Sequence, residues 1–269
     1  MTGVQTCALP IFSATTALLY RDLEKNEKHN SALALAPGFE NGENISPSGQ
    51  RFIRQPFAVH TAQLVEKIFS GKSLVAADAS ESKFREEADQ FRIIHLGTHT
   101  EINPGSPMLS RLILSRSADD DGYLHAYELY NLSLRAELAV LTACETGVGK
   151  ASSSEGMLSM AHGFAYAGCP SLVMSLWKID EKTSATIIEE FYENLAEGMA
   201  KNEAIREAKL TYLKEADEEL RNPYYWSGLV LYGDIAAIPG DAAPDWWLWL
   251  AALALVGLLL ILRFRKKRA

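Results

Sequence analysis

The sequence contains few cysteines and lacks the short motifs that identify several large classes of enzymes and binding proteins. Only 3 of its 269 residues are cysteine, which is too few for a small disulfide-bonded scaffold. It has no Walker phosphate loop, dinucleotide-binding glycine motif or calcium-binding EF-hand loop. His29, His60 and His125 lack the neighbouring Cys, Asp or His residues that a zinc site requires. We therefore expect neither a cofactor nor a metal.

The body of the chain also lacks an excess of basic residues. The whole sequence holds 26 Lys and Arg against 34 Asp and Glu, a net charge of −8. Five of the bases lie in residues 263–269, so the rest carries 21 bases and 34 acids, a net charge of −13. Phosphate contacts need a basic surface, which argues against a nucleic-acid partner. With 48% hydrophobic and 22% charged residues, the composition is that of a globular protein of one large or two small domains.

The first eleven residues are not expected to belong to the natural protein. MTGVQTCALPI reads as the in-frame translation of a common short-read sequencing adapter. On this interpretation residues 1–11 are an artefact, the natural sequence begins near Phe12, the protein is truncated upstream and Cys7 is not a natural cysteine. The alternative is a short strand or an uncleaved signal fragment, but no basic region precedes the apolar run and Pro10 interrupts it.

The one long uncharged hydrophobic run lies near the C-terminus. Residues 246–262 are 17 residues without a charge, and as a helix they would span roughly 26 Å. Tryptophans at the start of this run and the bases of 263–269 after it predict a transmembrane helix with a cytoplasmic tail, joined to the body by a linker at 240–245. The body would then be extracytoplasmic. Alternatives are a buried core helix, a bacterial C-terminal sorting tail of the same layout, or a cytoplasmic body.

Between these ends, short apolar runs alternate with helix-like segments. Runs suited to buried strands occur at 33–36, 74–77, 91–96, 112–114, 138–142, 172–176 and 229–232. Apolar residues at three- and four-residue spacing predict helices at 58–69, 81–90, 155–167, 181–197 and 202–219. This alternation predicts an α/β fold with a mostly parallel sheet and helices on both faces. Functional residues are then expected at the carboxyl ends of the strands.

Two reactive side chains follow strands of this predicted sheet. His99 comes three residues after the run 91–96, and Cys144 comes two residues after the run 138–142, so both are expected on loops at the same edge. A nearby imidazolium stabilises a thiolate, which is the nucleophilic form of cysteine. The Cys lies 45 residues after the His, close to the spacing of about 50 residues in caspases. Each residue alone would more often be structural.

Several motifs in order resemble a known family. They are IIHLGTH, SRLILS, DGYLHAYELYNLSLRAELAVLTACETGVG, SEGMLSMAHGFAYAGCPSLVMSLWKID, FYENLAEGMAKNEAIREAK and PYYWSGLVLYGD. Together they resemble the CHAT domain, a branch of the caspase and separase clan of cysteine peptidases that is often found after tetratricopeptide repeats. The resemblance implies a caspase-like three-layer fold over about residues 12–239. It also implies a protein or peptide substrate, and a tetratricopeptide or other regulatory domain upstream.

The resemblance assigns His99 as the catalytic histidine and Cys144 as the nucleophile, working as a dyad. The oxyanion hole would use the backbone N–H groups of Thr100 and Cys144. Thr100 is a departure, because relatives usually have glycine there and a β-branched residue adopts positive φ only at a cost. A misaligned hole would lower the rate about a hundredfold or more.

Two acidic residues are candidates for binding a basic residue of the substrate. Glu145 adjoins the nucleophile, and Asp180 follows the strand at 172–176. The alternatives are that Glu145 is exposed or bonds to the glycine-rich turn, and that Asp180 caps the helix beginning near Glu181.

Other conspicuous residues are expected to be structural. We expect His95 to be buried and hydrogen-bonded, Cys169 to be a packed free thiol without a disulfide, and His162 to pack within a helix. Trp177 and Trp226 are expected to be core aromatics.

Two functions follow from these residues. The first is a membrane-anchored cysteine endopeptidase that uses His99 and Cys144. The alternative is a catalytically inactive CHAT module that acts in binding or assembly, with Thr100 as a sign of lost activity.

Overall fold

The computed structural model describes residues 31–39, 52–142, 144–145 and 154–238, without the side chains of 144–145 and 154–156. The adapter-like segment 1–11, the linker at 240–245, the hydrophobic run 246–262 and the basic tail 263–269 lie outside these residues. Among the helices of the described part, none is long and apolar enough to cross a membrane.

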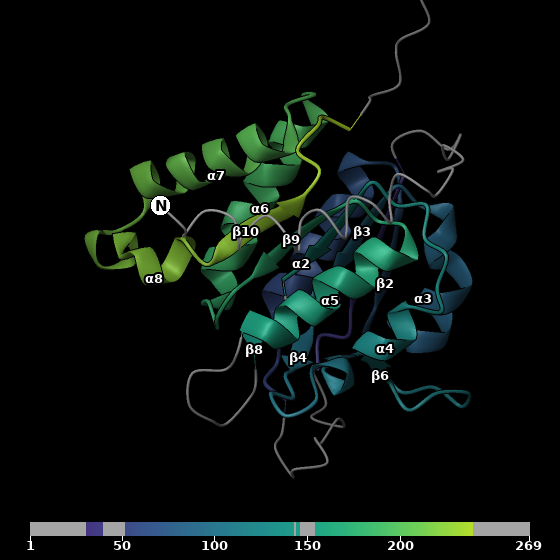
Figure 1. The fold of residues 1–269 in the computed structure, drawn as a ribbon. Coiled ribbons are helices and arrows are strands. Elements are labelled where there is room, and N and C mark those ends of the chain that lie inside the picture. The colour runs from purple at the N-terminus through teal and green to yellow at the C-terminus, as the bar shows by residue number, and fades with distance from the viewer. Residues whose placement is uncertain (1–30, 40–51, 143, 146–153, 239–269) are drawn as a thin grey trace, which may run out of the picture. The chain divides into compact units, whose positions relative to one another are not determined.

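A six-stranded sheet forms the centre of the fold, with the strand order β10-β9-β7-β3-β1-β2 (Figure 1). All neighbouring strands are parallel except β10, which is antiparallel to β9. The prediction of a mostly parallel α/β sheet is confirmed. The strands are β1 (Ala32–Ala36), β2 (Lys72–Val75), β3 (Ile93–Leu96), β7 (Leu138–Leu141), β9 (Ser171–Ser175) and β10 (Leu229–Gly233).

Helices cover both faces of this sheet because its strands are apolar on both faces. Leu33 and Leu35 of β1 pack into the core on one side, while Ala34 and Ala36 pack into the core on the other. The first core includes residues of α3 (Glu81–Glu87), α4 (Ala126–Leu129) and α5 (Ser154–Ala167). The second includes residues of α2 (Pro56–Ile68), α6 (Glu181–Ala196) and α7 (Lys201–Glu215).

Short elements complete the described part. The predicted helix at 81–90 ends in a 3-10 turn, and the predicted helix at 202–219 stops at Glu215 and is followed by another 3-10 turn. These turns are η2 (Ala88–Gln90) and η4 (Glu218–Arg221); the others are η1 (Ala76–Asp78) and η3 (Pro107–Leu109), and α8 (Pro223–Trp226) precedes β10.

A second, four-stranded sheet has the order β6-β5-β4-β8. Its strands are β4 (His99–Glu101), β5 (Arg111–Ile113), β6 (Tyr123–His125) and β8 (Cys144–Glu145). The predicted strand at 112–114 therefore belongs to this sheet. The expectation that His99 and Cys144 lie on loops is wrong, because each is the first residue of a short strand. Strand β4 begins soon after the end of β3, and β8 begins soon after the end of β7. Both strands are short and mostly polar, so they lack the apolar run by which the strand at 112–114 is recognised.

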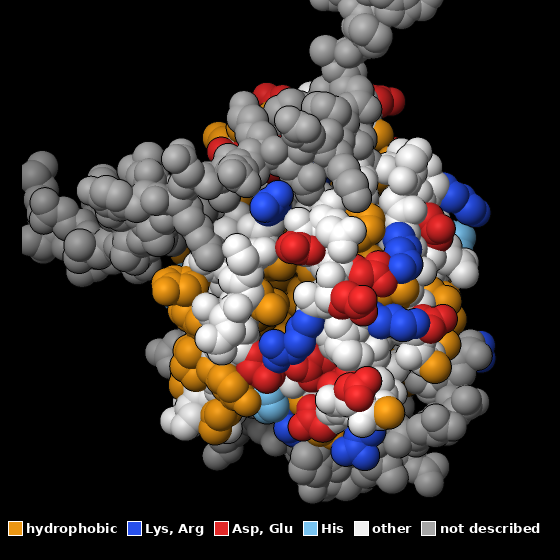
Figure 2. All heavy atoms as spheres, turned by 90° about the vertical axis from the view of Figure 1, so that its right-hand side faces the viewer, with side chains coloured by type: hydrophobic (Ala, Val, Ile, Leu, Met, Phe, Trp, Pro, Cys, Tyr) orange, Lys and Arg blue, Asp and Glu red, His pale blue; other side chains and the backbone are white. Residues whose placement is uncertain are grey.

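Acidic and basic side chains are interspersed on the face of the molecule that Figure 2 shows. On α3, Arg85 pairs with Glu81 of the same helix at 2.7 Å and with Glu128 of α4 at 2.8 Å. Lys72 of β2 pairs with Glu87 at 2.6 Å. These pairs connect α3 to α4 and to the edge of the central sheet.

Candidate active site

Strands β4 and β8 bring the two predicted catalytic residues side by side. They are parallel neighbours, with His99 paired to Cys144 and Thr100 paired to Glu145 in register. Neighbouring strands lie about 4.8 Å apart, so these backbones adjoin although 45 residues separate them in the sequence. The arrangement follows from the parent strands, because β3 and β7 are parallel neighbours in the central sheet and each leads directly into the second sheet.

The His99 imidazole is held by a backbone carbonyl. Its Nε2 lies 2.7 Å from the carbonyl oxygen of Ile53, a residue of the segment that precedes α2. A carbonyl oxygen only accepts, so Nε2 must carry the hydrogen and donate it. In the neutral ring the lone pair is then on Nδ1, which is the basic nitrogen of this tautomer.

Two phenylalanine rings pack against the same imidazole. The centroid of the Phe52 ring lies 5.3 Å from that of His99 with an interplanar angle of 23°, and the centroid of Phe39 lies 4.8 Å away. The three side chains are 3–7% exposed. Phe39 and Phe52 also pack with Ile113 and Tyr123 of the second sheet in a small apolar cluster.

Gln55 connects the segment before α2 to the turn between β3 and β4. Its backbone N–H donates to the Gly38 carbonyl at 3.0 Å, and its Nε2 donates to the Thr98 carbonyl at 3.5 Å. The Thr98 hydroxyl donates to the carbonyl of Ile113 in β5. The segment that contacts His99 through Phe52 and Ile53 is therefore bonded both to the residue before Phe39 and to the residue before His99.

Thr100 fits its position without backbone strain. The described residues with positive φ, other than glycine, are Phe39, Ser70 and Ala76, so the left-handed geometry that would disfavour threonine is not required at position 100. Thr100 lies within β4 and is fully buried. The left-handed geometry considered for threonine is therefore not found at this residue.

Asp180 caps α6, as the alternative to a binding role predicts. It is exposed, and its Oδ2 accepts the N–H of Thr183 at 3.0 Å. The neighbouring Glu181 accepts the N–H groups of Phe57 and Ala58 at 2.8 and 3.0 Å and so joins the start of α6 to the start of α2. Burial raises the pKa of Glu181 despite these two bonds. The side chain of Glu145, the other candidate for substrate binding, lies outside the described atoms.

The remaining sequence candidates are packed in the core or at its edge. His95 is fully buried with Nδ1 3.0 Å from the Tyr192 hydroxyl, and burial lowers its pKa to about 3. Cys169 is a buried free thiol whose pKa burial raises to about 12. These two predictions are confirmed.

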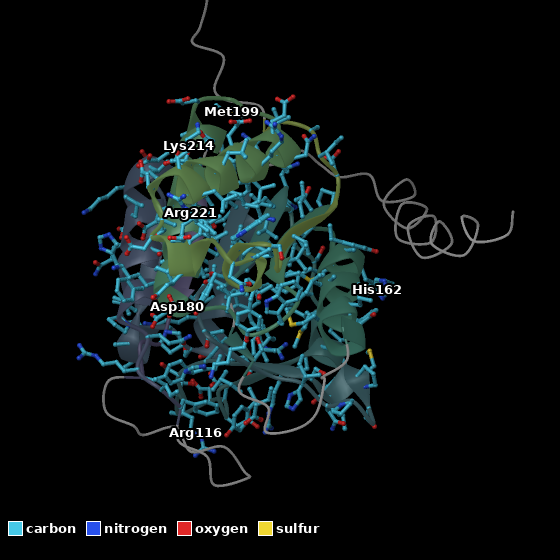
Figure 3. The ribbon with its side chains drawn as sticks, turned by 90° about the vertical axis from the view of Figure 1, so that its left-hand side faces the viewer. Arg116, His162, Asp180, Met199, Lys214 and Arg221 are labelled. Atoms are coloured by element: carbon cyan, nitrogen blue, oxygen red, sulfur yellow. The ribbon has the colours of Figure 1, made fainter. Side chains whose placement is uncertain are left out.

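His162, Trp177 and Trp226 are half-buried. His162 lies on α5, well away from Asp180 in the view of Figure 3, and its ring is 6.2 Å from that of Tyr232. The two tryptophans pack at the edge of the core rather than at its centre. No group of three or more His, Cys, Asp and Glu residues that could hold a metal occurs within the described ranges.

Sequence reasoning missed the residues around His99. The contact from Ile53 is made by a backbone carbonyl, which any residue would supply, so the sequence carries no sign of it. Phe39 and Phe52 lie 60 and 47 residues before His99, and neither belongs to a periodic pattern. The only local signal was Pro56, which marks the first turn of α2 and thus the end of the segment that holds the histidine.

Comparison with known proteins places this geometry in a family. The sequence model of the CHAT domain family matches residues 8–234 of this chain. Tetratricopeptide repeat protein 28 of Homo sapiens is 22% identical over 262 residues, covering 84% of this chain but 10% of that protein. This chain thus spans a small part of that longer relative.

Solved peptidase structures share the fold. The Arg-specific cysteine proteinase gingipain R of Porphyromonas gingivalis matches with a TM-score of 0.52 and 11% identity over 88% of this chain and 54% of its own. The Saccharomyces cerevisiae separase–securin complex matches with a TM-score of 0.50 and 14% identity, over 83% of this chain and 13% of the other. At these identities the likeness is one of fold.

Proposed function

The chain belongs to the CHAT domain family, and from this membership we propose that it is a cysteine endopeptidase that cleaves a peptide bond of a protein or peptide substrate. One observation carries the proposal, namely the register that pairs His99 with Cys144 on adjacent parallel strands. The hydrogen bond from His99 Nε2 to Ile53 supports it, because it leaves Nδ1 as the basic nitrogen of the ring.

In the proposed mechanism, the imidazole of His99 takes the thiol proton and the Cys144 sulfur attacks the scissile carbonyl carbon. The tetrahedral oxyanion is bound by the backbone N–H groups of Thr100 and Cys144. His99 then protonates the leaving amine as the C–N bond breaks, which leaves a thioester on Cys144. Next, His99 removes a proton from water, and the resulting attack hydrolyses the thioester and restores the thiol.

The substrate side of the site would favour a basic residue before the cut. Asp180 and Glu145 are acidic, and the body of the chain carries a net charge of −13. The capping bond of Asp180 uses Oδ2 and is compatible with this role, because a carboxylate has further acceptor positions on both oxygens.

We also propose that the enzyme is anchored in the cytoplasmic membrane by residues 246–262, with its tail 263–269 in the cytoplasm and its body outside. The proposal rests on the charge pattern alone. A tetratricopeptide repeat domain upstream would regulate the enzyme, in keeping with the similarity to part of tetratricopeptide repeat protein 28.

The test is cleavage of a random peptide library by the full chain in detergent, with Cys144→Ala and His99→Ala as controls. We expect mass spectrometry to find new peptide termini with the wild-type chain and none with either variant. Equal cleavage by all three chains, or cleavage by none, would contradict the peptidase and favour the inactive binding module.

A further inference from the structure

The His99 ring lies in a small aromatic enclosure that the proposed reaction does not itself use. Phe52 stacks on one side of it at 5.3 Å, Phe39 packs on it at 4.8 Å, and the two phenylalanine rings are 5.5 Å apart. The three side chains come from three separate segments, namely the residues after β1, the segment before α2, and β4. Only the folded chain brings these three segments together, unlike a pair of neighbours on one helix.

The backbone at Phe39 is strained to make this contact. Gly38 and Phe39 both have left-handed φ values, 70° and 53°, and a bulky side chain adopts this region only at a cost in energy. The bond from Gln55 N–H to the Gly38 carbonyl at 3.0 Å ties the strained turn to the segment that carries Phe52 and Ile53. Glycine at position 39 would relieve the strain, but it would also remove the ring that packs on His99.

The orientation of the His99 ring determines which of its nitrogens faces the Ile53 carbonyl and which is left as the base. The outer torsion of a histidine side chain has a broad, roughly two-fold preference, so an unrestrained imidazole can turn over. A half-turn of the ring would take Nε2 away from the Ile53 carbonyl and would place Nδ1 where Cδ2 now lies. Phe52 stacked on one face of the imidazole and Phe39 packed beside it at a tilt leave little room for this rotation, whereas the hydrogen bond to Ile53 alone would compete with water.

We propose that Phe39 and Phe52 are positioning residues for His99, which keep the imidazole in the orientation and tautomer that leave Nδ1 as the base. This inference rests on the proposed function, since it concerns the histidine of the same dyad. The effect of the two phenylalanines is exerted through the ring of His99.

The test is substitution by leucine, which keeps an apolar side chain but removes the aromatic face. Phe39→Leu and Phe52→Leu are compared with Phe69→Leu, because Phe69 is 6% exposed and packs in the core of α2, α6 and α7, not in the cluster of Phe39 and Phe52. The full chain is treated with iodoacetamide at about pH 6, and modification of Cys144 is followed by peptide mass spectrometry. Thermal unfolding checks that each variant is folded.

We expect Phe39→Leu and Phe52→Leu to slow the alkylation of Cys144 about tenfold or more, because small misplacements of a catalytic group have effects of this size. Phe69→Leu should leave the rate unchanged at a similar loss of stability. Nitrogen NMR of labelled histidine supplies a second readout that needs no reaction. Wild-type His99 should show the tautomer with hydrogen on Nε2, and the two leucine variants should show a mixture.

This experiment distinguishes a failure of the peptidase proposal from a failure of the positioning proposal. If wild-type Cys144 reacts as an ordinary thiol and is unaffected by His99→Ala, the peptidase itself is contradicted. If wild-type Cys144 reacts fast at low pH through His99, but both leucine variants retain that rate and the Nε2 tautomer, the peptidase stands and the positioning role is wrong.

Discussion

His95 couples the stability of the fold to pH. In the folded protein burial lowers its pKa to about 3 from an ordinary value of 6.5. Since the folded pKa is the lower one, the stabilisation from keeping this residue neutral is fully present above about pH 6.5 and is lost as the pH falls toward 3. Over that window we expect the free energy of unfolding to fall by about 1.4 kcal/mol per pH unit from this group.

Urea denaturation of the wild-type chain and of His95→Gln across this pH range measures the effect. The carboxylates titrate in both chains, so the difference between the two pH slopes isolates His95. Identical slopes would mean that His95 is not held in its neutral form.

Asp180→Asn tests whether the negative charge of Asp180 selects a basic residue in the substrate. Asn caps a helix as well as Asp does, so Asp180→Asn keeps the bond to the Thr183 N–H and removes only the negative charge. We expect kcat/KM for peptides with Arg or Lys before the cut to fall about tenfold, with thermal stability unchanged. Glu145→Gln tests the other acidic candidate in the same way. Unchanged preference in both variants would exclude these residues from specificity.

At the scale of elements, the junction between β3 and β4 depends on glycine at position 97. A Cβ there would lie 3.0 Å from the Ala58 Cβ and 3.2 Å from His95 Nε2. Gly97→Ala should push the start of α2 away from the sheet, costing about 1–3 kcal/mol and moving the Ile53 carbonyl away from His99. We expect lower stability in urea denaturation together with slower alkylation of Cys144.

Gly105→Ala is the matched control for this change. Its nearest atom to an added Cβ is the Asn103 side-chain oxygen at 3.7 Å, so its effect should stay within about 0.5 kcal/mol. If Gly97→Ala behaved like Gly105→Ala, the start of α2 would not be held tightly against this junction.

The elements that could be predicted are those with enough residues to show a period. The six strands of the central sheet and helices α2, α5 and α6 lie within a few residues of their predicted positions. Strands β4 and β8 could not be predicted, because they are short and mostly polar and so lack the apolar run that marked the similarly short β5. Their pairing depends instead on the neighbouring central strands. The adjacency of His99 and Cys144 could be inferred from those parent strands, but the enclosure by Phe39, Phe52 and Ile53 depends on tertiary contacts alone.

At the scale of the whole molecule, the central prediction from the charge pattern is a body outside the cytoplasmic membrane. Protease added to intact bacterial spheroplasts that express the full chain should degrade the body and leave the tail 263–269 protected. An epitope tag added after Ala269 detects the tail after the digestion, and antibodies raised against the body detect the body. Protection of the body until the membrane is lysed would contradict this topology.

The most direct test of the account as a whole is the pH dependence of Cys144 alkylation in the full chain, with and without His99→Ala. A thiol near an imidazolium ionises well below the usual pKa of about 8.5. We predict that Cys144 reacts rapidly at about pH 6 in the wild-type chain and that His99→Ala abolishes this low-pH reaction. If Cys144 titrates as an ordinary thiol in both folded chains, the two residues form no catalytic pair and the peptidase is contradicted.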